Sequence, residues 1–516
     1  MDKTSATYQR LELHRTLWNM AVTMRGTMEG SEYRNYVLGL LFYRTLSEKT
    51  ESIIAGLLAE DGNMDYVAAW NNEEYRAVIE ETLLNDLGYV IPPIYLWSTM
   101  VVEIRKGANG EFDTEYLQKG INTIMTSTIG KESQEDFENL FDDLDLNSPR
   151  LGRDVKTRTR IIADNILAID GIDFNLGDSK IDVLGDAYEY LIGNFAASAG
   201  KKAGEFYTPQ QVSTILARIV AAGKNRLSNV YDPTCGSGSL LLRVAREIEV
   251  GEFYGQELMS TTFNLARMNM MIHDVPYNRF HIKNGNTLTE PMHIDRKFEA
   301  IVANPPYSAS WETTELTLQD ERFSGYGKLA PSTKADFAFV QHMIYHLDDE
   351  GTAAVVLPHG VLFRGAAEGV IRKKIIEDNR LHAVIGLPAN IFFGTGIPTC
   401  ILVFKKNRTT NEPILFIDAS QEFEKSKNSN SLTNENVNKI TDAYTSRQEV
   451  EKYSALVAKE QIAENDYNLN IPRYIDNTDE EQLVDLDEVE NNISVIANEI
   501  LDLDNRINAI MKGLVG

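Results

Sequence analysis

The sequence predicts an α/β protein with a doubly wound, mainly parallel, Rossmann-like sheet, a helical N-terminal domain before it and a coiled-coil-like C-terminal helix after it. Three observations support this prediction. Apolar residues recur at helical spacing in residues 1–165, short apolar runs alternate with helical segments from about Ser228 onward, and a heptad seam occupies the C-terminal end. With 516 residues, the chain has room for about three domains.

Residues 1–165 are expected to form the helical domain. Stretches such as 13–24 and 36–46 repeat apolar residues at the spacing of one helix face. Few alternations of β-branched residues occur there, and Gly-Asn and Asp-Gly pairs separate the helical stretches. The region therefore predicts helices joined by turns.

Residues 166–420 are expected to hold the sheet. Each predicted strand is a short apolar run, and helical segments separate the runs as in βαβ units. The predicted strands are 229–231, 253–255, 281–283, 300–302, 353–357, 383–385 and 400–404. This alternation favours a mainly parallel sheet.

The C-terminal part divides into a polar segment and a patterned tail. Residues 421–475 are expected to be a linker and partner-contact segment, since 421–438 is rich in Asn, Ser, Lys and Glu. Residues 476–516 are expected to form a helix. Between Asp476 and Gly516 there are eleven acidic and two basic residues, which disfavours nucleic acid as the partner of this helix. Its apolar residues alternate spacings of three and four: Leu486, Val489, Ile493, Ile496, Ile500, Leu503, Ile507, Ile510 and Leu514. Such a narrow seam packs against another helix, in a partner or in the same chain.

Charge and composition limit the possible functions. The chain has 76 acidic and 50 basic residues and a formal charge of -26, so alone it should bind duplex DNA poorly, and a DNA function needs a basic partner. Acidity that serves only solubility is the alternative. No apolar run of about 18 residues predicts a membrane span, and the expected location is the cytoplasm. Cys235 and Cys400 lack the companions of a disulfide framework or a zinc site, and no metal is expected.

A glycine-containing turn follows the first predicted strand. It reads Asp232-Pro233-Thr234-Cys235-Gly236-Ser237-Gly238, and a helical segment comes next. Glycines at such a turn let the backbone approach a ligand and present amide donors at the positive end of a helix. The pattern is neither Gly-x-Gly-x-x-Gly nor a turn followed by Gly-Lys-Ser/Thr, so NAD and ATP are disfavoured. An ordinary strand-to-helix turn is the alternative.

Two later strands end in polar residues that suit a nucleoside. Glu257 lies about 20 residues beyond the glycine turn, where an acidic residue accepts both ribose hydroxyls in doubly wound folds. Asn286-Thr287 follows the third strand, and the Asn286 amide is a candidate acceptor for an exocyclic amine. A solvated Glu and a turn Asn are the alternatives for these two positions.

The fourth strand delivers Asn304-Pro305-Pro306-Tyr307 at its carboxyl end, where open α/β sheets bind ligands. The prolines fix φ and remove two amide donors, which leaves carbonyl oxygens free to accept. An amino group on a planar base would donate one hydrogen to the Asn304 side chain and one to the Pro305 carbonyl, which aims its lone pair at an electrophile. Tyr307 is expected to stack on a base flipped out of the duplex. A simple polyproline-type turn is the alternative.

In this order the motifs resemble the DNA amino-methyltransferases and, in detail, the modification subunit of type I restriction-modification systems; the resemblance spans nearly the whole chain. It implies S-adenosyl-L-methionine as cofactor, with contacts from Asp232–Gly238. Asn304 at the head of the catalytic motif implies N6-adenine methylation, whereas Ser would imply cytosine N4. The family's upstream cofactor motif matches Glu205, Phe206, Tyr207, Thr208 and Pro209.

Weaker matches agree in order. Residues 335–339 resemble a helix that lines the cofactor pocket, and 390–395 resemble a loop whose aromatic residue, Phe392 or Phe393, stacks on the target base. Asn286 departs from the family pattern, because many relatives carry Asp there. Residues 33–48 resemble the family's helical N-terminal domain, and 466–470 with the following heptads resemble its partner-binding end.

The resemblance also implies partners. In the family a separate specificity subunit selects the DNA target, a separate motor-nuclease subunit cleaves DNA, and two copies of the modification subunit join one specificity subunit. The acidic charge and the unpaired heptad seam agree with these implications. A protein or RNA amino-methyltransferase of the glutamine-amide type and a catalytically silent scaffold are the alternatives.

Overall fold

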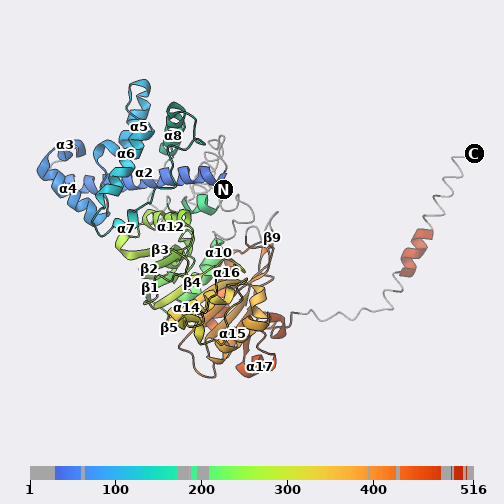
Figure 1. Ribbon diagram of the computed structural model, residues 1–516. Coiled ribbons are helices and arrows are strands. Elements are labelled where there is room, and N and C mark those ends of the chain that lie inside the picture. Colours follow the sequence, from blue (N-terminus) through green and yellow to red (C-terminus); the bar gives the residue numbers. More distant parts are fainter. Residues whose placement is uncertain are drawn as a thin grey trace, which may run out of the picture.

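The structure is a computed structural model (Figure 1). It describes residues 30–59, 64–172, 185, 188–193, 208–392, 396–425, 430–477, 490, 493–501, 503 and 507. The helix predicted over 13–24 lies outside these residues. So do Glu205, Phe206, Tyr207 and Phe393, and much of the C-terminal heptad segment.

Helices make up the N-terminal region, as the apolar spacing predicts. The long α2 (Gly30–Ala59) runs through the centre of this region, and its buried face includes Val37, Leu41 and Leu46. The other helices are α3 (Tyr66–Trp70), α4 (Glu73–Asp86), α5 (Trp97–Arg105), α6 (Thr114–Ser127), α7 (Gln134–Phe137) and α8 (Val155–Asp170). Asp113 and Asp154 cap α6 and α8 by accepting backbone amide hydrogens, which satisfies donors that a helix N-terminus leaves free.

A nine-stranded sheet follows, in the order β11-β8-β6-β7-β5-β4-β1-β2-β3. The strands from β3 to β5 are parallel to one another, β7 is antiparallel to both neighbours, β8 is parallel to β6, and β11 is antiparallel to β8. The strands are β1 (Arg226–Asp232), β2 (Glu249–Glu257), β3 (Phe280–Asn284), β4 (Phe298–Ala303), β5 (Leu347–Pro358), β6 (Leu381–Gly386), β7 (Thr399–Lys405), β8 (Ile414–Asp418) and β11 (Ser454–Val457). A mainly parallel sheet whose strand order reverses between β1 and β4 is the predicted doubly wound fold, which is confirmed.

Helices cover both faces of this sheet. Val230 and Val302 point to one face of the sheet, whereas Tyr231 and Ile301 point to the other, and a different group of helices packs on each face. This alternation follows from the two-residue period of strands. The first group is α10 (Gln210–Ala221), α11 (Ser239–Glu247), α12 (Ser260–Ile272) and α16 (Asn434–Ser446), and the second is α13 (Glu321–Ser324), α14 (Asp336–His346), α15 (Ala366–Glu377) and α17 (Lys459–Glu464).

The helical N-terminal region docks on α12, beside the β1–β3 end of the sheet (Figure 1). Arg267 of α12 is only 1% exposed, and its Nη1 donates to the carbonyl oxygens of Glu135, Asp136 and Glu138. Asn264 adds a hydrogen bond to Asp143 at 2.9 Å. Burying a guanidinium is costly unless it is hydrogen-bonded, so the bonds from Arg267 help to hold the helices on the sheet.

The structure differs from the sequence prediction most clearly in residues 421–475. This segment, predicted to be a linker, contains α16, which packs on α10, and β11, which extends the sheet. A short two-stranded sheet, β9 (Glu424–Lys425) with β10 (Asn430–Ser431), also lies there. The polar residues of α16 reflect its half-exposed position, because one face of this helix meets water.

The C-terminal segment contributes a helix over residues 493–501. The seam residues Ile493, Ile496 and Ile500 are each more than half exposed. Within the part of the chain that is described, no helix has the length and apolar character needed to cross a membrane.

Candidate active site

The glycine turn leads from β1 into α11. Gly236 and Gly238 have φ values of 54° and 76°, a left-handed conformation that glycine adopts without the steric cost of a side chain. Asp232, at the end of β1, accepts a hydrogen bond from the Thr234 amide at 2.9 Å. Its carboxyl is buried, and this burial raises the pKa of Asp232 to about 7. The turn therefore places a buried acid directly before the N-terminus of α11.

Glu257 closes the turn from β2. Its carboxylate accepts hydrogen bonds from the amides of Gly236 at 3.0 Å and Met259 at 2.9 Å. Burial raises the pKa of Glu257 above its usual range, although these backbone donors oppose the shift. Cys235 lies in the same turn, and its amide donates to the Gln256 carbonyl at 3.0 Å. Its thiol is buried, and burial beside Glu257 and Asp232 raises the pKa of Cys235 well above the usual value.

The loop after β3 joins this arrangement. The Thr287 hydroxyl donates to the Pro233 carbonyl at 2.6 Å, and the Gly285 amide donates to the Glu257 carbonyl at 3.0 Å. Asn286 accepts from the Leu288 amide at 3.0 Å, which is an Asx-turn geometry. The structure thus brings the predicted cofactor residues of three strands together.

Asn304 lies at the same edge of the sheet. Tyr231 of β1 pairs with Ile301 of parallel β4, so the two strands end side by side. The Asn304 Nδ2 donates to the Thr208 hydroxyl at 3.1 Å, which joins the described end of the upstream motif, Thr208-Pro209, to the catalytic motif. The Asn304 Oδ1 is buried and has no hydrogen-bond partner among the described residues. It is therefore an acceptor that a donor from a ligand can satisfy.

Aromatic rings stand beside this acceptor. Tyr307 and Phe392 meet edge to face, with ring centroids 6.0 Å apart and an interplanar angle of 80°. The Tyr307 hydroxyl is buried without a partner in the described part of the chain, and burial raises the pKa of Tyr307 well above its usual value. Of the two candidate stacking residues, Phe392 thus contacts the catalytic motif. Pro305 is buried and Pro306 is half-buried between these groups.

Asp336 supports the catalytic turn from the first residue of α14. Its carboxylate accepts from the Ser308 amide at 2.8 Å and is paired with Arg364 at 2.6 Å. Ser308 has a φ of 51°, a conformation that a non-glycine residue holds only with support. The resemblance implied a pocket-lining helix here, whereas the support that Asp336 gives to Ser308 was missed. The sequence does not indicate the positive φ of Ser308.

The arrangement fits S-adenosylmethionine, whose methyl donor is a cation and whose ribose carries two hydroxyls. Buried Asp232 and Glu257 suit a cationic, hydroxyl-bearing ligand, and the Asn304 oxygen, which no described residue pairs, suits an amino group. In the described residues no cluster of His, Cys, Asp and Glu could hold a metal ion. Sheet order and site together define a Rossmann-like, S-adenosylmethionine-dependent methyltransferase with an acceptor site for an amine.

Comparison with known families identifies the family of this methyltransferase. Residues 179–483 match the model of the N-6 DNA Methylase family, and residues 13–167 match the HsdM N-terminal domain. The chain belongs to the N-6 DNA methylase family. This confirms the predicted enzyme, an adenine-specific DNA methyltransferase, and the glutamine-amide alternative is not favoured.

The curated relatives and solved structures agree. The MpnII type I restriction enzyme methylase subunit of Mycoplasma pneumoniae is 37% identical, over 98% of this chain and 97% of its own length. The HindI methylase subunit of Haemophilus influenzae is 34% identical over 58% of this chain and 70% of its own. A crystal structure of a type I methyltransferase subunit from Streptococcus thermophilus has a TM-score of 0.83 and 41% identity, and covers 90% of this chain and 100% of that one. The predicted resemblance to type I modification subunits is confirmed.

Proposed function

We propose that this chain is the catalytic modification subunit of a type I restriction-modification complex and transfers a methyl group to the N6 amino group of a flipped-out adenine. The roles assigned to its residues rest on one observation: the Oδ1 of Asn304, beside the cofactor turn, is buried and has no hydrogen-bond partner within the described ranges. A buried acceptor without a donor is uncommon in a folded protein and points to a ligand.

The target side holds the amine. One N6 hydrogen is donated to the Asn304 Oδ1 and the other to the Pro305 carbonyl, which draws the nitrogen lone pair out of conjugation with the ring. Tyr307 and Phe392 face the extruded base, and Asp336 keeps the turn in place through the Ser308 amide. No general base is required, because the surplus proton leaves to water after transfer.

The cofactor side holds the donor. S-adenosylmethionine supplies, when bound, an electrophilic methyl group on a sulfonium. Glu257 would accept hydrogen bonds from the ribose hydroxyls, with the lone pairs that its two hydrogen bonds from backbone amides leave free. Asp232 and the Gly236–Gly238 turn would receive the cationic end, and Asn286 and Thr287 would face the adenine ring. The family motif at 205–209 would add further cofactor contacts.

Target selection belongs to partners. The net charge of -26 disfavours duplex binding by this chain alone, so a specificity subunit brings the DNA in the cytoplasm. The exposed seam residues Ile493, Ile496 and Ile500 lie on the helix that engages this subunit. Two copies of the chain serve one specificity subunit, and a motor-nuclease subunit completes the complex. A structure of complex assembly in a type I restriction-modification system contains a chain of this fold, with a TM-score of 0.62 and 21% identity.

The activity is tested on the assembled enzyme. The chain is purified with the specificity subunit encoded beside it and incubated with S-adenosylmethionine and cognate duplex. Mass spectrometry of the released nucleosides should find N6-methyladenine. If only N4-methylcytosine, or no methylated base, accumulates in the cognate duplex, the proposed reaction is wrong.

The partner contact is tested on the tail. Removal of residues 486–516 should abolish co-purification with the specificity subunit. A triple variant, Ile493→Ser, Ile496→Ser and Ile500→Ser, should weaken it as well, because it removes the apolar seam. The matched control is Val495→Ser with Leu501→Ser, since both are exposed apolar residues of the same helix outside the seam. Equal loss in both sets of variants, or unchanged co-purification after the deletion, would contradict the proposal.

A further inference from the structure

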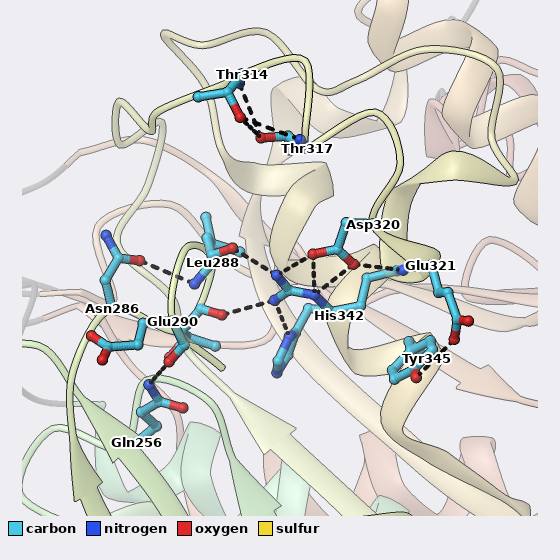
Figure 2. A network of polar contacts seen from close by, with 12 residues as sticks. Gln256, Asn286, Leu288, Glu290, Thr314, Thr317, Asp320, Glu321, His342 and Tyr345 are labelled. Carbon is cyan, nitrogen blue, oxygen red and sulfur yellow. Dashed lines mark hydrogen bonds and ion pairs between the residues drawn. The ribbon is translucent and has the colours of Figure 1, made fainter. Parts of the chain in front are cut away.

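A buried arginine connects the segment after the catalytic motif to the cofactor pocket. Arg322 lies in α13 and is only 2% exposed. Its Nη1 donates to the Thr287 carbonyl at 2.9 Å, and its Nη2 donates to the Leu288 carbonyl at 2.8 Å. Asp320 pairs with the same guanidinium at 2.7 Å (Figure 2). The side chain therefore spans from its own segment to the loop after β3.

His342 extends the network to β1. Its Nδ1 lies 3.0 Å from the Arg322 Nη1, and its Nε2 lies 3.0 Å from the Tyr231 hydroxyl. A guanidinium has only donors, so the Nδ1 accepts and the hydrogen of the neutral ring is on Nε2, which donates to Tyr231. Burial, with His346 and Arg322 nearby, lowers the pKa of His342 well below its ordinary value, which keeps the ring neutral. Tyr231 immediately precedes Asp232.

The loop that Arg322 holds is the one that bears two proposed cofactor contacts, Asn286 and Thr287. The Thr287 hydroxyl donates to the Pro233 carbonyl in the glycine turn. Gln256 fixes the continuation of this loop, because its amide donates to the Glu290 carbonyl at 2.8 Å (Figure 2). Four hydrogen bonds thus hold this loop: one from Thr287, one from Gln256 and two from Arg322.

Arginine is suited to this position by its geometry. The two carbonyl oxygens, the Asp320 carboxylate and the His342 nitrogen lie around one planar group with five donors. Lysine has three donors on a single nitrogen and cannot reach all four acceptors at once. Methionine has a similar length and no donors, so it would leave the carbonyls of Thr287 and Leu288 unpaired.

We propose that Arg322 is a positioning residue for the methyltransferase: it holds residues 286–288 against the glycine turn and so shapes the subsite for the adenosine part of S-adenosylmethionine. This inference rests on the proposed function. Arg322 does not touch the cofactor itself. It acts through the carbonyl groups of Thr287 and Leu288, and it belongs to the chain segment that follows the catalytic motif.

The test measures cofactor binding apart from methyl transfer. Isothermal titration calorimetry gives the Kd of the full chain for S-adenosylmethionine, and the reconstituted complex gives KM for S-adenosylmethionine and kcat at saturating cofactor. Arg322→Met should raise both Kd and KM at least tenfold and leave kcat within about threefold. Arg322→Lys should lie between this variant and the wild type, because it restores one or two of the bonds.

Arg408→Met is the matched control. Arg408 is also buried and donates to the carbonyl oxygens of Leu381, Glu412 and Pro413. Leu381, however, is at the amino end of β6, three strands away from β4 in the sheet, whereas the site lies at carboxyl ends. This variant should lower the melting temperature while its Kd stays within twofold of wild type. If it raises the Kd as much as Arg322→Met does, the effect is general destabilisation and the inference is wrong.

A milder variant keeps the test decisive if Arg322→Met does not fold. Asp320→Asn leaves the arginine in place but removes its charged partner, and it should raise the Kd about threefold. A Kd within experimental error of wild type for Asp320→Asn or, in a folded protein, for Arg322→Met would overturn the inference. A wild-type chain that binds no S-adenosylmethionine would instead overturn the proposed function.

Discussion

The two sides of the active site differ in how their polar groups are paired. On the cofactor side, Asp232, Glu257 and Thr287 are all bonded to backbone groups of neighbouring loops. On the target side, the Asn304 Oδ1 and the Tyr307 hydroxyl are buried without partners in the described chain. An unpaired buried polar group costs about 1–3 kcal/mol. The polar groups on the proposed cofactor side are therefore held in place by the protein itself, whereas on the proposed target side the Asn304 Oδ1 is available to accept a hydrogen bond from a base.

Asn304→Ala should have the largest effect and sharpen this contrast. It removes the acceptor that holds the amine, so methyl transfer by the complex should fall by ~10³-fold, the scale of losing a preorganised catalytic hydrogen bond. Binding of S-adenosylmethionine, measured by calorimetry, should stay within about twofold of wild type, since the cofactor residues keep their bonds. Loss of cofactor binding in a folded variant would show that the two sides are not separate.

Glu257→Ala should act on the other side. It removes an acceptor of charged hydrogen bonds, each of which contributes about 1.5–3 kcal/mol, so the Kd for S-adenosylmethionine should rise roughly tenfold to a hundredfold. Glu257→Gln should have a smaller effect, because one oxygen remains. With saturating cofactor, kcat of the complex should recover. A kcat that stays low at saturation would place Glu257 in the transfer step.

Tyr307 separates stacking from hydrogen bonding on the target side. Stacking of an aromatic side chain on a base contributes about 1–3 kcal/mol, so Tyr307→Ala should lower kcat/KM for DNA about tenfold. Tyr307→Phe keeps the ring and loses only a hydroxyl for which the described part of the chain offers no partner, so its kcat/KM should stay within about twofold. A large loss in Tyr307→Phe would mean that the hydroxyl contacts the base.

Asp232 predicts a modest pH dependence of cofactor affinity. Its pKa is about 7 in the folded chain, so at pH 6 most of the carboxyl is protonated. A cationic ligand favours the carboxylate, and binding must release a proton; the Kd at pH 6 should be about threefold to tenfold higher than at pH 7.5. Asp232→Asn should flatten this difference, apart from the titration of the cofactor's own amino group.

The same pKa shift affects stability with the opposite sign. Because the folded pKa of Asp232 exceeds the unfolded value of 3.8, its contribution to the folded state is greatest below pH 4 and is lost as the pH rises through 7. Chemical denaturation of wild type and Asp232→Asn at pH 5 and pH 8 measures it. The free energy of unfolding of Asp232→Asn relative to that of wild type should be higher at pH 8 than at pH 5.

The sequence predicted what local patterns encode. Seven strands were recognised because buried strands of a parallel sheet are short, continuous apolar runs. The glycine turn and Asn304 were recognised because their residue types suit one chemistry, and the structure places them at adjacent strand ends. Strands β8 and β11 were not predicted. The four residues of β11 at a sheet edge carry almost no pattern, whereas β8 is a short apolar run like the predicted strands.

Contacts between distant segments could not be predicted in this way. Arg322 is 35 residues from the carbonyl of Thr287 that it holds, and nothing near it in the sequence indicates a partner. Asp336 was assigned to the cofactor pocket through a resemblance, whereas its contact with Ser308 depends on how two loops meet. Such roles follow from packing, which a single sequence does not display.

The burial of Cys235 has a consequence for the enzyme's chemistry. A thiol reacts as the thiolate, and this one is sealed between two acidic side chains that oppose its ionisation. Alkylating agents and peroxide should therefore spare it until the loop around it opens. The rate at which a labelling reagent modifies the Cys235 thiol thus measures how often the glycine turn opens. Bound ligand should lower this rate.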